Sequence, residues 1–128
     1  MSGISQTAGL TTRIVGLGSH APERVVTNDD LSKMVDTTDQ WILSRTGIRE
    51  RRIAAADETT SDLALSAARN ALADAEVASE EIDLVVVATI TPDMAFPSTA
   101  CRLQHKLGLR NVCCFDLEAA CSGFIYAL

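Results

Sequence analysis

The residue best suited to chemistry is Cys121, which stands between small residues. The run 112–117 predicts a buried strand, and the apolar run 121–128 predicts a helix directly after it. Cys121 is therefore expected at a helix N-terminus, where unpaired N–H groups and the helix dipole favour thiolate over thiol. The small neighbours leave room for a substrate to reach the sulfur. This pattern indicates a nucleophile.

The other three cysteines are predicted to be packing residues. Cys101 falls on an expected helix, and Cys113 and Cys114 fall on an expected strand, so none shares the setting of Cys121. The four cysteines show neither metal-ligand spacing nor the framework of a secreted disulfide-rich domain. We expect no metal site, and a reducing cytoplasm fits this use of cysteine.

Alternating strands and helices predict an α/β fold with a mostly parallel sheet and helices on both faces. The helix expected at 61–75 is rich in alanine, which indicates that a neighbouring segment approaches it closely. The Gly-x-Gly at residues 16–18 stands alone and is too weak a motif to indicate a dinucleotide site. The expected strands are 13–19, 48–53, 83–89 and 112–117, and the expected helices are 29–35, 39–46, 61–75, 99–107 and 121–128.

Length and charge restrict the class of protein. The 128 residues suit one domain, at 11–128, after a flexible tail at 1–10. The net charge of −6 argues against nucleic-acid binding. No apolar stretch approaches the ~20 residues that span a bilayer, and no signal peptide is indicated. The helix expected at 121–128 is apolar on all sides, so we expect it to lie inside a larger structure, with the chain truncated after it.

Several separate motifs resemble β-ketoacyl-acyl-carrier-protein synthase III, a thiolase-like condensing enzyme. The resemblance runs from about Arg13 to Leu128 in the family's order and spacing, and it covers the family's N-terminal half only. It implies the N-terminal half of a thiolase-like fold for residues 11–128 and a homodimer for the full-length protein. The motifs that carry it are 36–42, 45–51, 91–93, 96–101 and 115–128.

This resemblance implies the first condensation of type II fatty-acid synthesis. An acyl-CoA acylates the cysteine at the position of Cys121, and malonyl-acyl-carrier protein then attacks with loss of carbon dioxide. Acyl-CoA is a substrate, so no cofactor is expected. The family's catalytic histidine and asparagine lie beyond residue 128, and His20 and His105 stand at no motif position.

Trp41 and Arg45 are predicted to hold coenzyme A. They are four residues apart and share a helix face, where an indole beside a guanidinium forms a platform for an adenine ring. By the resemblance, Asp36 and Thr37 are hydrogen-bonding partners near that ring. The segment 45–52 has four arginines and one glutamate, which suits the phosphates of coenzyme A.

Phe96 is assigned by the same resemblance to a segment that reaches across the dimer into the partner's acyl pocket. Two other interpretations stay open. Related thiolase-fold synthases that make quinolones, polyketides or hydroxymethylglutaryl-CoA share the cysteine, but fit the Trp41 and Phe96 motifs less well. The alternative outside enzymes is a non-catalytic half-domain that serves only in coenzyme A binding or subunit pairing. A reading frame that continues past codon 128 and supplies a histidine and an asparagine would favour the condensing enzyme over the non-catalytic half-domain.

Overall fold

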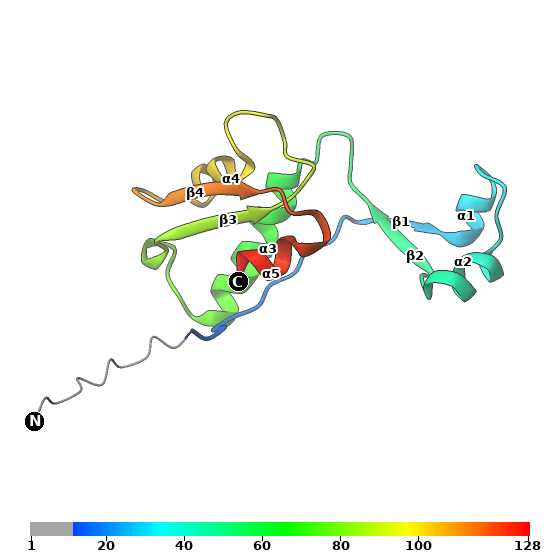
Figure 1. The fold of residues 1–128 in the computed structure, drawn as a ribbon, viewed down its shortest axis with the longest axis horizontal. Coiled ribbons are helices and arrows are strands. Elements are labelled where there is room, and N and C mark those ends of the chain that lie inside the picture. The colour runs from blue at the N-terminus through cyan, green and yellow to red at the C-terminus, as the bar shows by residue number, and fades with distance from the viewer. Residues whose placement is uncertain (1–11) are drawn as a thin grey trace, which may run out of the picture.

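The computed structural model describes residues 12–128, and the tail expected at 1–10 lies outside the described residues. Two small sheets organise the chain (Figure 1). Strands β3 (Leu84–Ala88) and β4 (Cys113–Leu117) form a parallel pair, and β1 (Arg24–Thr27) and β2 (Glu50–Ile53) form an antiparallel pair. The α/β class is confirmed. The parallel arrangement is confirmed for β3 and β4 alone, because the other pair is antiparallel.

The main apolar core lies where two helices pack beside the parallel pair. Helix α3 (Thr60–Ala75) contacts α4 (Thr99–Leu107), and α4 in turn contacts both strands. The helix starts are explained by capping, since the Thr59 and Ser98 hydroxyls face the first turns of α3 and α4. The buried hydrophobic residues of this core are Val85, Ala100, Leu103 and Leu109.

The strand expected at 13–19 is wrong. These residues are extended but form no strand, and they run beside α3 instead (Figure 1). The Leu17 N–H donates to the Asp74 carboxylate at 2.9 Å. A β-carbon at Gly18 would lie 2.2 Å from the Ala67 carbonyl oxygen, so only glycine permits this approach. The close neighbour indicated by the alanines of α3 is this segment.

The first strand of the antiparallel pair was not expected. β1 aligns Thr27 with Glu50 and Arg24 with Ile53, and it contains only two apolar residues, between an arginine and a threonine. The partner strand, expected at 48–53, is present from Glu50 onward. A four-residue strand gives too short an alternation to be recognised from sequence.

Two short helices lie between these strands in the chain: α1 follows β1, and α2 precedes β2. Helix α1 (Asn28–Ser32) is capped by Thr27, and it ends three residues before the expected Val35. Helix α2 (Asp39–Thr46) is confirmed over its predicted length. Its Thr38 hydroxyl accepts the Trp41 N–H, and Gly47 ends it with a φ of 72°.

Within residues 12–128, no helix combines the length and apolar character needed to cross a membrane. The same residues contain no group of three or more histidine, cysteine or carboxylate side chains placed to hold a metal ion.

Candidate active site

Cys121 lies at the carboxyl edge of the parallel pair. β3 and β4 end together, with Ala88 opposite Leu117, and a short 3-10 turn, η2 (Ala120–Ser122), carries the cysteine soon after β4. A β-carbon on Gly123 would lie 3.1 Å from the Ala88 β-carbon, so the residues after Cys121 rest on the end of β3. The cysteine is exposed. Ligands of α/β proteins characteristically bind at this edge.

The helix expected to begin at Cys121 begins later. Helix α5 (Gly123–Ala127) has only five residues, and the cysteine sits in the 3-10 turn before it. A helix of five residues has a small dipole, so its effect on the Cys121 thiol is smaller than the sequence suggested. Ala120 has a φ of 44°, a left-handed conformation that costs a residue with a β-carbon ~1–2 kcal/mol. Backbone strain of this kind concentrates at functional sites.

The other thiols have different surroundings. Burial raises the pKa of the Cys114 thiol, and the neighbouring Cys101 and Cys113 thiols raise it further. The Cys114 thiol also donates to the Val112 carbonyl at 3.4 Å. A raised pKa leaves less thiolate, so Cys114 is a poor nucleophile.

Three of the four residues predicted to hold coenzyme A come together. Asp36, Thr37 and Trp41 line an open hollow of about 270 Å³ with Thr38, before the first turn of α2. Trp41 is 58% exposed, which supports a free face for stacking. The Thr37 Oγ1 atom is buried without a hydrogen-bond partner, a state that costs ~1–3 kcal/mol until a partner arrives. Arg45 lies one turn further along α2 and does not line the hollow.

Two arginines of the basic segment have partners within the chain. The Arg51 Nη1 donates to the Asn28 Oδ1 at 2.8 Å. Arg52 lies 3.6 Å from the Glu50 carboxylate and donates to carbonyls near Pro22. The interpretation of this segment as a phosphate site therefore rests on Arg45 and Arg49.

The polar hub beside the hollow is not predictable from the sequence. Asn28 is 1% exposed, and its Nδ2 donates to the Asp39 carboxylate at 2.7 Å and to the Ile48 carbonyl at 2.9 Å. With its bond from Arg51, this one side chain joins α1, α2 and β2. Its partners lie 11 to 23 residues away, so no local pattern in the sequence indicates this role.

A second missed network surrounds Asp93, in the connection between β3 and α4. Its side chain is 1% exposed and lies 2.7 Å from the Arg102 Nε. Burial alone would raise the pKa of this carboxyl. Hydrogen bonds from Ser61 and Arg102 outweigh that effect and hold its pKa below the usual value. The exposed Phe96, at 87%, belongs to the same connection.

Ser61 and Lys106 have the spacing of a serine–lysine pair, but they are structural. The Lys106 Nζ lies 2.6 Å from the Ser61 Oγ. Ser61 is fully buried and donates its hydroxyl proton to Asp93 at 2.5 Å. Hydrogen bonds from Lys106 and Thr59 hold the pKa of the Asp62 carboxyl well below its usual range. No substrate reaches this serine.

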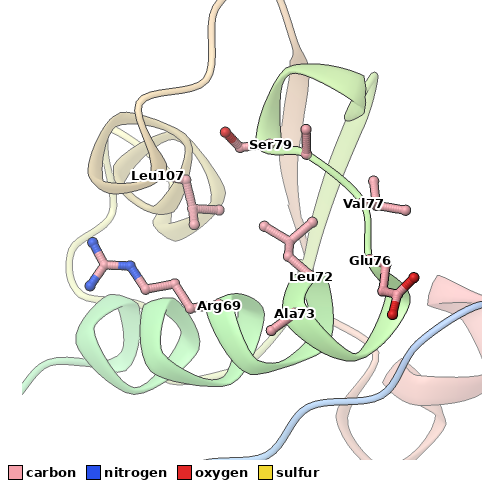
Figure 2. A pocket seen from close by; sticks show the side chains of 8 residues that line it. Arg69, Leu72, Ala73, Glu76, Val77, Ser79 and Leu107 are labelled. Atoms are coloured by element: carbon pink, nitrogen blue, oxygen red, sulfur yellow. The ribbon is translucent and has the colours of Figure 1, made fainter.

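An open hollow of about 520 Å³ lies at the other end of the parallel pair (Figure 2). Figure 2 shows Arg69 and Leu72 of α3 on the side of Leu107, whereas Glu76, which follows α3, points away from it, and η1 (Ser79–Glu81) lies nearby. Because η1 precedes β3, this hollow is at the amino ends of the strands. It is therefore separated from Cys121 by the length of the sheet.

Sequence comparison identifies relatives of known class. No protein-family model matches the chain. The β-ketoacyl-[acyl-carrier-protein] synthase III of Bacillus pumilus is 58% identical over 115 residues, which are 90% of this chain and 37% of the relative. The enzyme of the same name from Xanthomonas campestris is 63% identical over 119 residues, which are 91% of this chain and 36% of the relative.

Solved structures agree with the sequence comparison. The 3-oxoacyl-[acyl-carrier-protein] synthase III of Aquifex aeolicus matches with a TM-score of 0.88 and 53% identity, over 91% of this chain and 38% of that chain. The priming β-ketosynthase of the R1128 polyketide pathway matches with a TM-score of 0.86 and 46% identity, over 90% and 34%.

These similarities define the fold as thiolase-like α/β. Within that class, the resemblance to β-ketoacyl-acyl-carrier-protein synthase III is confirmed in both sequence and structure. The chain spans about 37% of the length of the curated relatives that it matches.

Proposed function

We propose that residues 12–128 supply the nucleophile and part of the coenzyme A site of a β-ketoacyl-acyl-carrier-protein synthase III. The observation that carries this proposal is 58–63% identity to enzymes of that name over nine-tenths of the chain. The substrates are an acyl-CoA and malonyl-acyl-carrier protein. The reaction begins type II fatty-acid synthesis.

Cys121 is the proposed nucleophile. Its Sγ attacks the thioester carbonyl of acyl-CoA, the acyl group moves to the sulfur, and the coenzyme A thiolate leaves and takes up a proton. Malonyl-acyl-carrier protein then loses carbon dioxide, and its α-carbon attacks the acyl-enzyme and releases the Cys121 thiolate. Cysteine suits both steps because sulfur is a good nucleophile and a good leaving group. The exposed thiol at the strand edge supports this role.

The hollow at Trp41 is the proposed site for the adenine end of coenzyme A. The exposed indole offers a stacking face, and the unpartnered Thr37 hydroxyl, with Asp36 beside it, offers hydrogen bonds. Arg45 supplies charge for phosphate from the same helix. Phosphate oxygens are good acceptors for a guanidinium, so this assignment needs no metal.

Phe96 is the proposed contact with a second subunit of a homodimer, at the acyl pocket. Its 87% exposure in the single chain supports a partner outside the described residues. A reducing cytoplasm is the proposed compartment, because four cysteines occur without a disulfide among the described residues.

The similarity to a priming β-ketosynthase supports a second candidate, a starter enzyme of polyketide synthesis. It uses the same residues, with Cys121 as the acyl acceptor. The two candidates differ in the acyl-CoA and the carrier protein that they accept. Competition between the two carrier proteins for one acyl-enzyme distinguishes them.

The proposal is tested by incubating the full-length protein, meaning the complete reading frame that carries these residues, with radiolabelled acetyl-CoA. Protease digestion should recover the label on the peptide that contains Cys121. Label on Cys101, Cys113 or Cys114 alone would contradict the assignment. The 128-residue chain, tested in parallel, should acylate slowly and form no condensation product, because its relatives are almost three times longer.

A further inference from the structure

The side chain of Asn28 lies between two charged groups of opposite sign. Asn28 is the first residue of α1 and is 1% exposed. Its Nδ2 donates to the Asp39 carboxylate at 2.7 Å, and its Oδ1 accepts a hydrogen bond from the Arg51 Nη1 at 2.8 Å. An amide can donate to a carboxylate and accept from a guanidinium at the same time. Asn28 therefore forms a bridge between a carboxylate on α2 and a guanidinium on β2.

The same residue also holds the turn that leads into β2. Its Nδ2 donates a second hydrogen bond, to the Ile48 carbonyl at 2.9 Å, and its backbone N–H donates to the Arg49 carbonyl at 3.3 Å. Both amide protons and the amide oxygen are thus in use. A replacement that lacks any of these groups leaves at least one partner without its hydrogen bond to residue 28.

Asp39 connects this bridge to the hollow at Trp41. It opens α2 and directly follows Thr38, whose hydroxyl accepts the Trp41 N–H. The hollow is lined by the residues on either side of Asp39, which are Asp36, Thr37, Thr38 and Trp41. A shift of the start of α2 therefore moves both the indole and the buried Thr37 hydroxyl, which has no hydrogen-bond partner within residues 12–128.

Few other contacts hold α1 and α2 in place at the end of the antiparallel pair (Figure 1). Within residues 12–128, each side-chain hydrogen bond that joins α1, α2 and β2 to one another involves Asn28. The two ion pairs of this part of the chain each lie within one element or its cap. The buried hydrophobic residues of the segment 24–53 are Val26 and Ile42. The amide bridge is therefore the main polar link between these elements.

We propose that Asn28 is a positioning residue for coenzyme A, because its bridge between Asp39 and Arg51 holds the hollow at Trp41 in the shape that receives the substrate. This inference rests on the proposed function, which assigns that hollow to coenzyme A. Asn28 does not line the hollow and acts through the start of α2. Its effect is on the binding of acyl-CoA, whereas the acylation of Cys121 by bound substrate does not depend on it.

The first test is Asn28→Asp in the full-length protein, which keeps the size of the side chain and removes both donors. A carboxylate then faces the Asp39 carboxylate, and the Ile48 carbonyl loses its donor. The KM for acyl-CoA should rise about tenfold, because a small displacement of binding groups has a large effect. The kcat should stay within about twofold of the wild type, as expected where binding alone is lost.

The matched control is Asn70→Asp, which makes the same chemical change on α3. The Asn70 Nδ2 donates to the Ser19 carbonyl at 2.9 Å, and this bond is exposed. The KM for acyl-CoA should stay at the wild-type value in this variant. An equal rise of KM in Asn28→Asp and Asn70→Asp would overturn the proposal, because it would show a general effect of an added carboxylate.

A double variant separates positioning from simple damage. When Asn28→Asp is combined with Asp39→Asn, the amide at position 39 donates to the carboxylate at position 28, which still accepts from Arg51. The bridge is rebuilt with its polarity exchanged, although the bond to the Ile48 carbonyl stays lost. The KM should return to within about threefold of the wild type, since residues in one network are coupled. A folded double variant with the KM of Asn28→Asp overturns the proposal.

A further variant keeps the test decisive if Asn28→Asp does not fold. Arg51→Gln keeps a donor on β2 but removes the charge on that side of the bridge. A hydrogen bond to a charged group is stronger than one between neutral groups. The KM should therefore rise by a smaller factor than in Asn28→Asp, with kcat unchanged. A folded Arg51→Gln protein with the wild-type KM contradicts the bridge.

Direct binding separates this inference from the proposed function. Coenzyme A without an acyl group is titrated into each full-length protein in a calorimeter, which needs no catalysis. Asn28→Asp should bind coenzyme A about tenfold more weakly than the wild type, in line with its KM. An unchanged affinity in Asn28→Asp defeats the role of Asn28 alone. Failure of the wild type to bind coenzyme A defeats the proposed function, and this inference with it.

Discussion

Two regions of the molecule are stabilised in different ways. Residues 60–128, which carry the proposed nucleophile and are termed the reactive region, have an apolar core between α3, α4 and the parallel strands. Residues 24–53, which carry the proposed coenzyme A contacts and are termed the coenzyme region, bury only Val26 and Ile42 among their hydrophobic residues and depend on the polar hub at Asn28. Apolar packing tolerates small shifts, but hydrogen bonds are directional. The coenzyme region should therefore lose its geometry when one side chain is changed.

The largest expected effect is at Cys121. Cys121→Ser in the full-length protein should lower kcat/KM for condensation by about a thousandfold or more, because the hydroxyl is a weak nucleophile without an adjacent base. The matched control is Cys113→Ser, an exposed cysteine on β4, which should keep wild-type activity. Steady-state kinetics with acetyl-CoA measure both. Equal losses in the two variants would show that this region needs its thiols only for packing.

The next effect tests the apolar core. Leu103→Ala removes a buried side chain between α4 and its neighbours and should lower the free energy of unfolding by ~2–5 kcal/mol. The KM for acyl-CoA should stay near the wild-type value, because Leu103 packs in the cluster with Val85, Ala100 and Leu109. Urea denaturation and kinetics on the same preparation give both numbers. A large increase in KM would mean that the two regions are coupled.

Asn28→Ala tests the polar hub, and it should affect substrate binding more than stability. It leaves the Asp39 carboxylate, the Ile48 carbonyl and the Arg51 guanidinium without this partner. The expected loss of stability is ~1–3 kcal/mol, smaller than for Leu103→Ala. The KM for acyl-CoA should nevertheless rise, because the hub holds α2 against β2. Acyl-CoA titration of the two variants side by side shows whether stability and binding separate as predicted.

These variants also show which features were readable from sequence. The bounds of α2 and α4 were predicted close to the observed ones, because the glycines that end both helices and the Ser98 cap of α4 are local to each helix. The motif residues Asp36, Thr37 and Trp41 did come to line one hollow. Their roles in binding remain predictions.

The remaining features depend on partners far apart in the chain. Asp93 and Ser61 are 32 residues apart, and no periodicity links them. Residues 13–19 resemble a strand that ends in a glycine turn, but their neighbour is α3 rather than another strand. The start of α5 was misplaced because a residue at positive φ, Ala120, precedes Cys121, and apolar periodicity does not report such a turn.

A smaller effect is expected within the hollow. Trp41→Ala should raise the KM for acyl-CoA about tenfold, since stacking on an aromatic ring is worth ~1–3 kcal/mol. Trp41→Phe keeps a ring and should restore most of the binding. The stability of both variants should be near that of the wild type, because Trp41 is 58% exposed. A KM unchanged by Trp41→Ala would return this residue to an ordinary surface role.

The smallest expected effect is on the pH dependence of folding stability. It is tested by comparing one carboxylate from each region. Hydrogen bonds lower the pKa of Asp93 and of Asp30, whose partners are Lys33 and Thr27. A folded pKa below the unfolded value, near ~3.9, adds stability above that pH and loses it as the pH falls toward the folded pKa. Both carboxylates therefore stabilise the protein at neutral pH, and both contributions decline in acid.

The contributions of Asp93 and Asp30 to stability should differ in size because their surroundings differ. The Asp93 side chain is 1% exposed, whereas Asp30 is 45% exposed, and water screens an exposed pair. Urea midpoints between pH 7 and pH 3 should fall less steeply for Asp93→Asn than for the wild type. Asp30→Asn should follow the wild-type curve closely. If Asp30→Asn flattens the curve more than Asp93→Asn does, then the exposed cap of α1 contributes more than the buried network, and the contrast drawn between the two regions is reversed.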